Sequence, residues 1–231
     1  MFHLASSLYT QYTKREQYNI LILGLDNAGK STFLEHLKLI YPPAGETNRK
    51  KNEERPPTTE TIRSKRILPT VGQNVAVIGY RDPENPQFNH VNLKFWDLGG
   101  QRLLRGMWSR YYKSCHGIIF MIDSTDTERF QECYNTLIKI THDQSWNDDD
   151  SYSELVSVPI LMMANKQDLP TAVDLISLKT GYFIDLVSRL EAADLKLLPV
   201  SVLENQGLSE SLSWLVTHLI YNKPNRMPDY R

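Results

Sequence analysis

Residues 24–31 read GLDNAGKS and fit the pattern GxxxxGK[ST] at every specified position. The apolar run 18–23 precedes this stretch, and Phe33, Leu34 and Leu37 follow it with the spacing of a helix. A glycine-rich turn between a buried strand and a helix points backbone N–H groups and the positive end of the helix dipole at bound phosphate. We therefore predict a phosphate-binding loop; the alternative is a chance match in a glycine-containing turn.

The residues of this loop have separate expected roles. Gly24 and Gly29 let the backbone wrap around the phosphates. Lys30 is expected to reach the β- and γ-phosphates, and the Ser31 hydroxyl to ligate Mg²⁺. The predicted phosphate contacts are the residues of the loop and one later glycine: Gly24, Asp26, Asn27, Ala28, Gly29, Lys30, Ser31, Thr32 and Gly100.

The composition is that of a globular chain with one core. It has 231 residues, of which 41% are hydrophobic, and a net charge of −1, so we expect no nucleic-acid partner. The two cysteines, Cys115 and Cys133, form no disulfide framework or zinc pair and are expected to be reduced in a cytosolic protein. We see no stretch as long as a membrane span and no signal peptide.

Strand-like and helix-like segments alternate along the chain, which predicts an α/β fold. The expected fold is that of a P-loop NTPase, with a mixed, mainly parallel, six-stranded sheet and helices on both faces. Strands are expected at 18–23, 72–80, 91–96, 117–122, 158–164 and 197–200, and helices at 30–40, 127–142, a broken stretch across 172–192, and 208–221. The second and third strands are joined by turn-forming residues and are predicted to form an antiparallel hairpin.

Two polar segments are predicted to be insertions in a domain that covers residues 18–222. Residues 42–66 carry more basic than acidic side chains, and they are either a basic patch near a membrane or partner, or a solvated mobile loop. Residues 144–154 contain three consecutive aspartates without the spacing of a calcium loop, and are expected to be solvated. Residues 1–17 form a separate amphipathic segment and 223–231 a C-terminal tail.

The stretch 96–101 reads WDLGGQ and follows a predicted strand. Asp97 is expected to hold Mg²⁺ through water, the Gly100 N–H to bond a γ-phosphate, and Gln101 to orient an attacking water. The alternative is an ordinary Asp-Gly-Gly turn.

Thr70, in the stretch PTVG, could add its hydroxyl to the Mg²⁺ ligands only when a γ-phosphate is present. The conformation of this segment would then depend on whether GDP or GTP is bound.

The stretch 165–168 reads NKQD and distinguishes between nucleotides. The Asp168 carboxylate can accept from N1–H and the 2-amino group of guanine, whereas adenine lacks that amino group and presents an acceptor at N1. The Lys166 stem is expected to lie over the base. The predicted guanine contacts are therefore Asn165, Lys166 and Asp168, together with Ser201 and Val202 behind the base through backbone N–H.

Together these motifs resemble the ARF and ARF-like branch of the Ras-like small GTPases. The matched core covers about 18–41, 67–80, 91–142 and 156–222, and the first two residues, the stretch from Pro69 and the end near Asn222 are most similar to the ARF-related group of the trans-Golgi. The resemblance implies a Ras-like G domain that cycles between GDP and GTP and hydrolyses GTP slowly. The implied partners are an exchange factor, an activating protein and GTP-dependent effectors.

The resemblance further implies a cytoplasmic monomer that is peripheral on Golgi membranes when GTP is bound, and that acts in vesicle and protein transport. ARF proteins carry a myristoylated glycine where this chain has Phe2, so that lipid cannot be attached. The implied targeting group is Met1, Phe2 and Leu8 on an N-terminally acetylated helix that a Golgi membrane-protein receptor recognises. The alternative is that this helix packs on the core.

The expected effector face contains Gln73, Trp96, Trp108 and Tyr111. Gln73 replaces a phenylalanine of the ARF aromatic trio, so effectors of ARF itself are not expected to bind. For Trp108, burial in the core is an equal alternative. Two other functions stay open from the sequence: a pseudo-GTPase that holds nucleotide without turnover, and an ATP-dependent kinase, against which NKQD argues.

Overall fold

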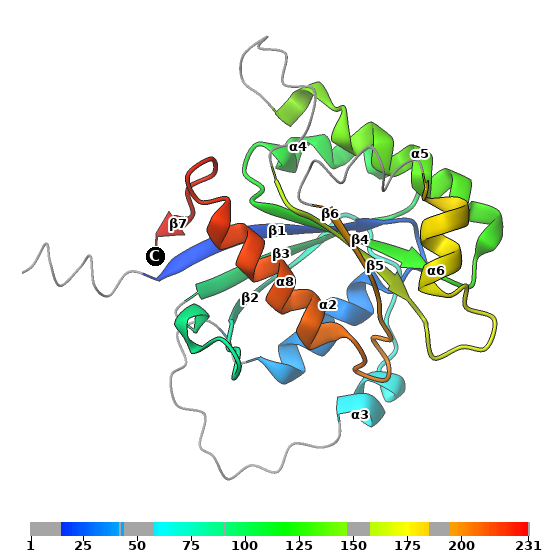
Figure 1. The fold of residues 1–231 in the computed structure, drawn as a ribbon, viewed down its shortest axis with the longest axis horizontal. Coiled ribbons are helices and arrows are strands. Elements are labelled where there is room, and N and C mark those ends of the chain that lie inside the picture. Colours follow the sequence, from blue (N-terminus) through cyan, green and yellow to red (C-terminus); the bar gives the residue numbers. More distant parts are fainter. Residues whose placement is uncertain are drawn as a thin grey trace, which may run out of the picture.

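The computed structural model describes residues 15–41, 43, 58–89, 91–146, 158–184 and 195–230. Its sheet has the strand order β2-β3-β1-β4-β5-β6, with β7 beside β1 (Figure 1). The strands are β1 (Glu16–Gly24), β2 (Gln73–Gly79), β3 (Val91–Leu98), β4 (Gly117–Asp123), β5 (Ile160–Asn165), β6 (Leu195–Pro199) and β7 (Asp229–Tyr230). The β2–β3 and β1–β7 pairs are antiparallel and the others are parallel, which confirms the mixed, mainly parallel sheet but with seven strands instead of six.

Helices cover both faces of this sheet. They are α2 (Lys30–Ile40), α3 (Thr58–Ser64), α4 (Ser109–Tyr112), α5 (Phe130–Thr141), α6 (Leu175–Ser177), which continues as a π-helical turn (Leu178–Tyr182), and α8 (Leu208–Tyr221). Apolar side chains of α2 and α8 share one core with β1 and β3, and those of α4 and α5 share the other with β4 and β5. All six predicted strands are found with ends within two residues of the expected ones, because their apolar runs fill these two cores.

Part of the predicted insertion 42–66 is helical, which the sequence did not predict. Within α3, Ile62 is buried, and Arg63 forms an ion pair with Glu204. Lys65, just past the helix, forms an ion pair with Glu35. These two basic residues are therefore partnered within the chain; residues 42 and 44–57 lie outside the described part.

The second predicted insertion also begins with packed structure. Residues 144–146 form a 3-10 turn whose Trp146 is buried and stacks on Tyr112, with ring centroids 4.3 Å apart. The expectation of a solvated loop was therefore wrong for Trp146, since its ring packs on a partner that lies far away in the sequence, whereas Gln144 is exposed. Residues 147–154 are outside the described part. No helix of the described residues is long and apolar enough to cross a bilayer.

The predicted C-terminal tail is attached to the sheet as far as it is described. β7 pairs with residues 16–17 of β1, and the Asn19 side chain donates to Asp229 at 2.9 Å. Arg226 donates to the carbonyls of Tyr112, Lys113 and Cys115 at 2.8–3.2 Å. The Arg226 side chain thus attaches the last described segment to the chain between α4 and β4.

Replacing Arg226 by methionine should destabilise the fold, because methionine keeps much of the apolar stem but leaves these carbonyls without their donor. We expect a loss of about 2 kcal/mol, which lowers the melting temperature by roughly 4–8 °C. Thermal unfolding of Arg226→Met measures this, with exposed Arg66→Met as the matched control. Equal shifts in the two variants would contradict the role given to Arg226.

Candidate functional site

A cavity of about 380 Å³ opens at the carboxyl ends of the parallel strands, where α/β sheets bind ligands. The turns after β1, β3 and β5 meet there. Most of the residues predicted for the site line this cavity: Asp26, Asn27, Gly29, Lys30, Ser31, Thr32, Thr70, Gly100, Gln101, Asn165, Lys166, Asp168 and Val202. Residues of four motifs that are far apart in the sequence, GLDNAGKS, PTVG, WDLGGQ and NKQD, therefore line the same cavity.

The turn between β1 and α2 has the backbone of a phosphate cradle. Gly24 and Gly29 have φ angles of 136° and 95°, and a Cβ at either position would overlap a neighbouring atom, the Met121 carbonyl oxygen or the Asn165 amide nitrogen. Asn27 is also left-handed, with φ 63°. Only residues that tolerate these angles let the chain close so tightly in front of the helix start.

Lys30, the first residue of α2, points back into this turn. Its Nζ donates to the Leu25 carbonyl at 2.5 Å. Burial lowers the pKa of Lys30 to about 8, although the nearby Asp97 and Asp26 carboxylates favour the charged form. A phosphate group at this position would give the buried ammonium a stronger acceptor than the carbonyl.

The three predicted metal residues lie together. Ser31 Oγ lies 2.6 Å from Asp97 Oδ2 and 2.7 Å from Thr70 Oγ1, and Thr70 donates to the same Asp97 oxygen at 3.1 Å. Asp97 is fully buried, and among the described residues its other oxygen, Oδ1, has no hydrogen-bond partner. Hard oxygens in this arrangement are ligands that suit Mg²⁺, which would satisfy the unpartnered carboxylate oxygen directly or through water.

Sequence reasoning missed Asn74 at this position. The antiparallel register of β2 and β3 places it opposite Asp97, and its side chain donates to Asp97 Oδ2 at 3.0 Å and to Thr70 at 3.1 Å. A polar residue at the start of a predicted hairpin strand, near PTVG, was the available signal. Asn74 thereby joins the two segments that carry Thr70 and Asp97.

The NKQD segment lies at the other end of the cavity. Asn165 donates to the Ala28 carbonyl at 2.9 Å, so it braces the phosphate loop. Ser201 Oγ donates to Asp168 Oδ1 at 2.6 Å, which fixes the direction of that carboxylate. The Val202 N–H, which was expected to contact the base, instead donates to Asn165 Oδ1 at 3.1 Å.

Lys166 is held by a residue that the sequence did not point to. Its Nζ donates to Asp123 Oδ2 at 2.5 Å, at the end of β4. Burial alone would raise the pKa of Asp123, but the Lys166 ammonium and the Thr125 hydroxyl and N–H keep it below its usual value. This ion pair fixes the lysine stem that was predicted to lie over the base.

The turn after β3 is held by its backbone and by a buried tryptophan. The Gly99 N–H donates to the Gly72 carbonyl at 3.0 Å, and the Trp108 indole donates to the Gly99 carbonyl at 3.1 Å. Trp108 is 2% exposed, so its assignment to the effector face was wrong, because the 3-10 turn Arg105–Met107 directs the ring into the core. Gln101 is exposed at the edge of the cavity.

The other three residues of the expected effector face are close together. The rings of Trp96 and Tyr111 have centroids 5.4 Å apart, and the Tyr111 hydroxyl donates to the Gln73 side chain. Lys94 lies over the Trp96 ring at 4.2 Å. The predicted targeting residues Met1, Phe2 and Leu8 lie outside the described residues.

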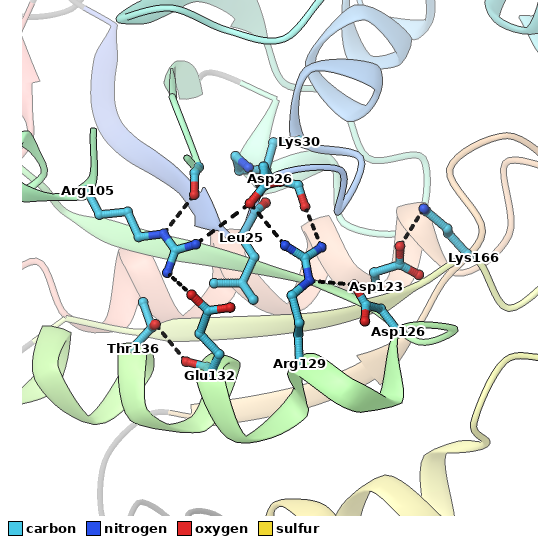
Figure 2. A network of polar contacts seen from close by, with 11 residues as sticks. Leu25, Asp26, Lys30, Arg105, Asp123, Asp126, Arg129, Glu132, Thr136 and Lys166 are labelled. Carbon is cyan, nitrogen blue, oxygen red and sulfur yellow. Dashed lines mark hydrogen bonds and ion pairs between the residues drawn. The ribbon is translucent and has the colours of Figure 1, made fainter. Parts of the chain in front are cut away.

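Figure 2 shows a polar network around the phosphate loop that sequence reasoning also missed. Arg129 donates to Asp26 Oδ1 at 3.0 Å, to the Asp26 carbonyl at 3.1 Å and to Asp126 at 2.6 Å. Arg105 lies on the other side of Asp26 and donates to Glu132 on α5 at 2.8 Å. Single charges in loops carry no sequence signal of which loops meet, so this network emerges only from the fold.

The comparisons with known proteins show the family of the chain. The model of the ADP-ribosylation factor family matches residues 4–42 and 58–219. The chain is 43% identical to ADP-ribosylation factor-like protein 3 of Saccharomyces cerevisiae, over 100% of both chains. It is 35% identical to human ADP-ribosylation factor-related protein 1, over 99% of both.

Among solved structures, the fold resembles the Arl6 BBS3 small GTPase from Trypanosoma brucei with bound nucleotide analogue GppNp, with a TM-score of 0.65 and 23% identity. The similarity covers 89% of this chain and 99% of that one. The chain therefore belongs to the ADP-ribosylation factor family of small GTPases, which bind GTP and GDP with Mg²⁺ and hydrolyse GTP.

Proposed function

We propose that the cavity holds the guanine nucleotide with its phosphates on the turn between β1 and α2 and its base against the NKQD segment. Lys30 and the loop N–H groups bind the phosphates, and the Asp168 carboxylate accepts from the guanine edge. Bound Mg²⁺ would neutralise charge on the β- and γ-phosphates, with Ser31, Thr70 and Asp97 as the residues that hold it. Gln101 orients the attacking water.

The observation that carries this proposal is the cluster of Ser31, Thr70 and Asp97. Their oxygens lie within 3.1 Å of one another although they come from α2, the segment before β2, and β3. Thr70 reaches this cluster from a loop, so its contact can form and break with the nucleotide state. This supports a switch that cycles between GDP and GTP.

We further propose that hydrolysis is slow without an activating protein, and that an exchange factor loads the nucleotide. Small GTPases in general interact with such regulators and with effectors. Gln73 of the cluster with Trp96 and Tyr111 is exposed and the two rings are half-buried, and Gln73 pairs with Leu98, three residues before Gln101. The position of this cluster supports its use as the effector face of a monomeric switch.

The site of action that we propose is the cytoplasmic surface of Golgi membranes, in vesicle and protein transport. The resemblance of the sequence motifs to the ARF-related group of the trans-Golgi supports this proposal. In this proposal Met1, Phe2 and Leu8 are the targeting group, and a receptor protein on the membrane recognises them.

Membrane recruitment tests this function. The N-terminally acetylated full chain, loaded with a non-hydrolysable GTP analogue, should sediment with Golgi-enriched membranes and not with pure liposomes. The GDP-loaded or non-acetylated chain should stay in the supernatant. Equal binding in both nucleotide states, or binding to neither membrane, would contradict the proposed targeting without touching the nucleotide site.

A further inference from the structure

Arg105 joins three parts of the molecule that meet at the phosphate end of the cavity. It begins the 3-10 turn four residues after Gln101, and its side chain is 13% exposed. Its Nε donates to the Gly100 carbonyl at 2.7 Å, and one terminal nitrogen donates to Glu132 Oε1 on α5 at 2.8 Å. The other terminal nitrogen lies 3.7 Å from Asp26 Oδ1 in the phosphate loop, as Figure 2 shows.

The bond to the Gly100 carbonyl fixes the peptide that leads into Gln101. A trans peptide is planar, and its C=O and N–H point in opposite directions. Holding the Gly100 oxygen therefore sets the direction in which the Gln101 backbone leaves the turn. The preceding peptide is held in the same way, because the Trp108 indole binds the Gly99 carbonyl and so aims the Gly100 N–H away from the core.

The turn has little room to take another position. A Cβ at Gly100 would come within 2.6 Å of the Gly24 carbonyl oxygen and of the Leu25 carbonyl carbon. The turn thus lies directly against the phosphate loop. A small rotation about the Gly100 backbone would tilt the two peptides that flank this residue and move the Gly100 N–H off a γ-phosphate, and hydrogen bonds weaken steeply with angle.

Arg129 provides a natural comparison. It also binds Asp26, at 3.0 Å, but its remaining described bonds go to the Asp26 carbonyl and to Asp126, so it reaches the phosphate loop without reaching the turn. Both arginines use a planar fork of donors that a lysine cannot reproduce. Arg105 therefore reaches both the loop and the turn, whereas Arg129 reaches the loop alone, so a comparison of the two isolates the support of the turn.

We propose that Arg105, anchored by Glu132, is a positioning residue: by holding the Gly100–Gln101 peptide it keeps Gly100 and Gln101 in the orientation used with GTP. The inference rests on the proposed function of Gly100 and Gln101. GDP lacks the γ-phosphate that the Gly100 N–H contacts, so Arg105 acts on the GTP state and on turnover, whereas Arg129 acts on both nucleotide states.

The test compares Arg105→Lys, Glu132→Gln and the matched control Arg129→Lys in the full chain. For each, the affinities for GDP and for a non-hydrolysable GTP analogue are measured with Mg²⁺, together with single-turnover hydrolysis of GTP and the melting temperature. Arg105→Lys should lower GTP affinity and the hydrolysis rate about tenfold each, with GDP affinity within about twofold of wild type. Glu132→Gln should lower the GTP affinity and the hydrolysis rate about threefold. Arg129→Lys should lower the affinities for GDP and for the GTP analogue equally.

Equal changes in GDP and GTP affinity for Arg105→Lys, or no change in hydrolysis, would overturn the inference and leave Arg105 a structural residue. If Arg105→Lys does not fold, Glu132→Gln decides on the same two criteria. Failure of the proposed function looks different, because the wild-type chain itself would then bind neither nucleotide or not hydrolyse GTP.

Discussion

Replacing Gln101 by leucine should lower the rate of GTP hydrolysis about a hundredfold, with the largest loss in the rate stimulated by an activating protein. The Gln101 side chain is exposed at the edge of the cavity, so a leucine of similar size fits without repacking the core. What is lost is the amide, whose oxygen and nitrogen can hold a water in line with the γ-phosphate. Single-turnover hydrolysis measures this loss.

The affinities of Gln101→Leu for GDP and GTP should stay near those of wild type, since the phosphate loop and the base site keep their contacts. The matched control is Arg102→Leu, which puts the same side chain on the next exposed position and should leave intrinsic hydrolysis unchanged. An unchanged rate in Gln101→Leu would remove Gln101 from the catalytic role.

The residues that the sequence identified are those whose neighbours in the chain already define their surroundings. Gly24 and Gly29 bracket a turn that no other backbone could make, and α2 begins at Lys30, where the pattern predicted a helix. The same holds for NKQD, because a polar segment at the end of a buried strand must lie at the carboxyl edge of the sheet. The local sequence was therefore sufficient to predict the phosphate loop and the position of the NKQD segment.

The residues that sequence reasoning missed depend on which loops meet. Asn74 reaches Asp97 only because the hairpin register sets them opposite each other. Arg105 and Arg129 converge on Asp26 from different segments, and Asp123 meets Lys166 because β4 and β5 are adjacent. A lone charge at the end of an element or in a loop can equally be solvated, so no pattern distinguished Arg105, Arg129 and Asp123 before the fold was known.

The predictions for Trp108 and for residues 58–64 were wrong for a related reason. The sequence left Trp108 undecided between surface and core, and the backbone turn over 101–108 decided it by burying the indole against Gly99. Residues 58–64 have too few apolar side chains to predict a helix, and Ile62 is the one that packs. In both cases tertiary contacts determined the outcome and local propensity did not.

Replacing Asp168 by asparagine should weaken the binding of both GDP and GTP about 10³-fold. In wild type the carboxylate accepts hydrogen bonds only, and Ser201 donates to Oδ1 at 2.6 Å and so fixes its direction. Guanine presents two donors, N1–H and the 2-amino group. Asparagine has the same shape but turns one acceptor into a donor, which leaves donor facing donor in the site.

The same substitution should raise the affinity for xanthine nucleotides, in which a carbonyl replaces the 2-amino group and can accept from the new amide. Competition between the two nucleotides measures this, with Asp174→Asn as the control, since Asp174 is an exposed carboxylate of the same loop that caps α6 through the Ser177 N–H. Equal loss for guanine and xanthine nucleotides would mean that Asp168 only stabilises the loop. A reversal of the preference between guanine and xanthine nucleotides would show that the Asp168 carboxylate recognises the base, because asparagine has the same shape as aspartate.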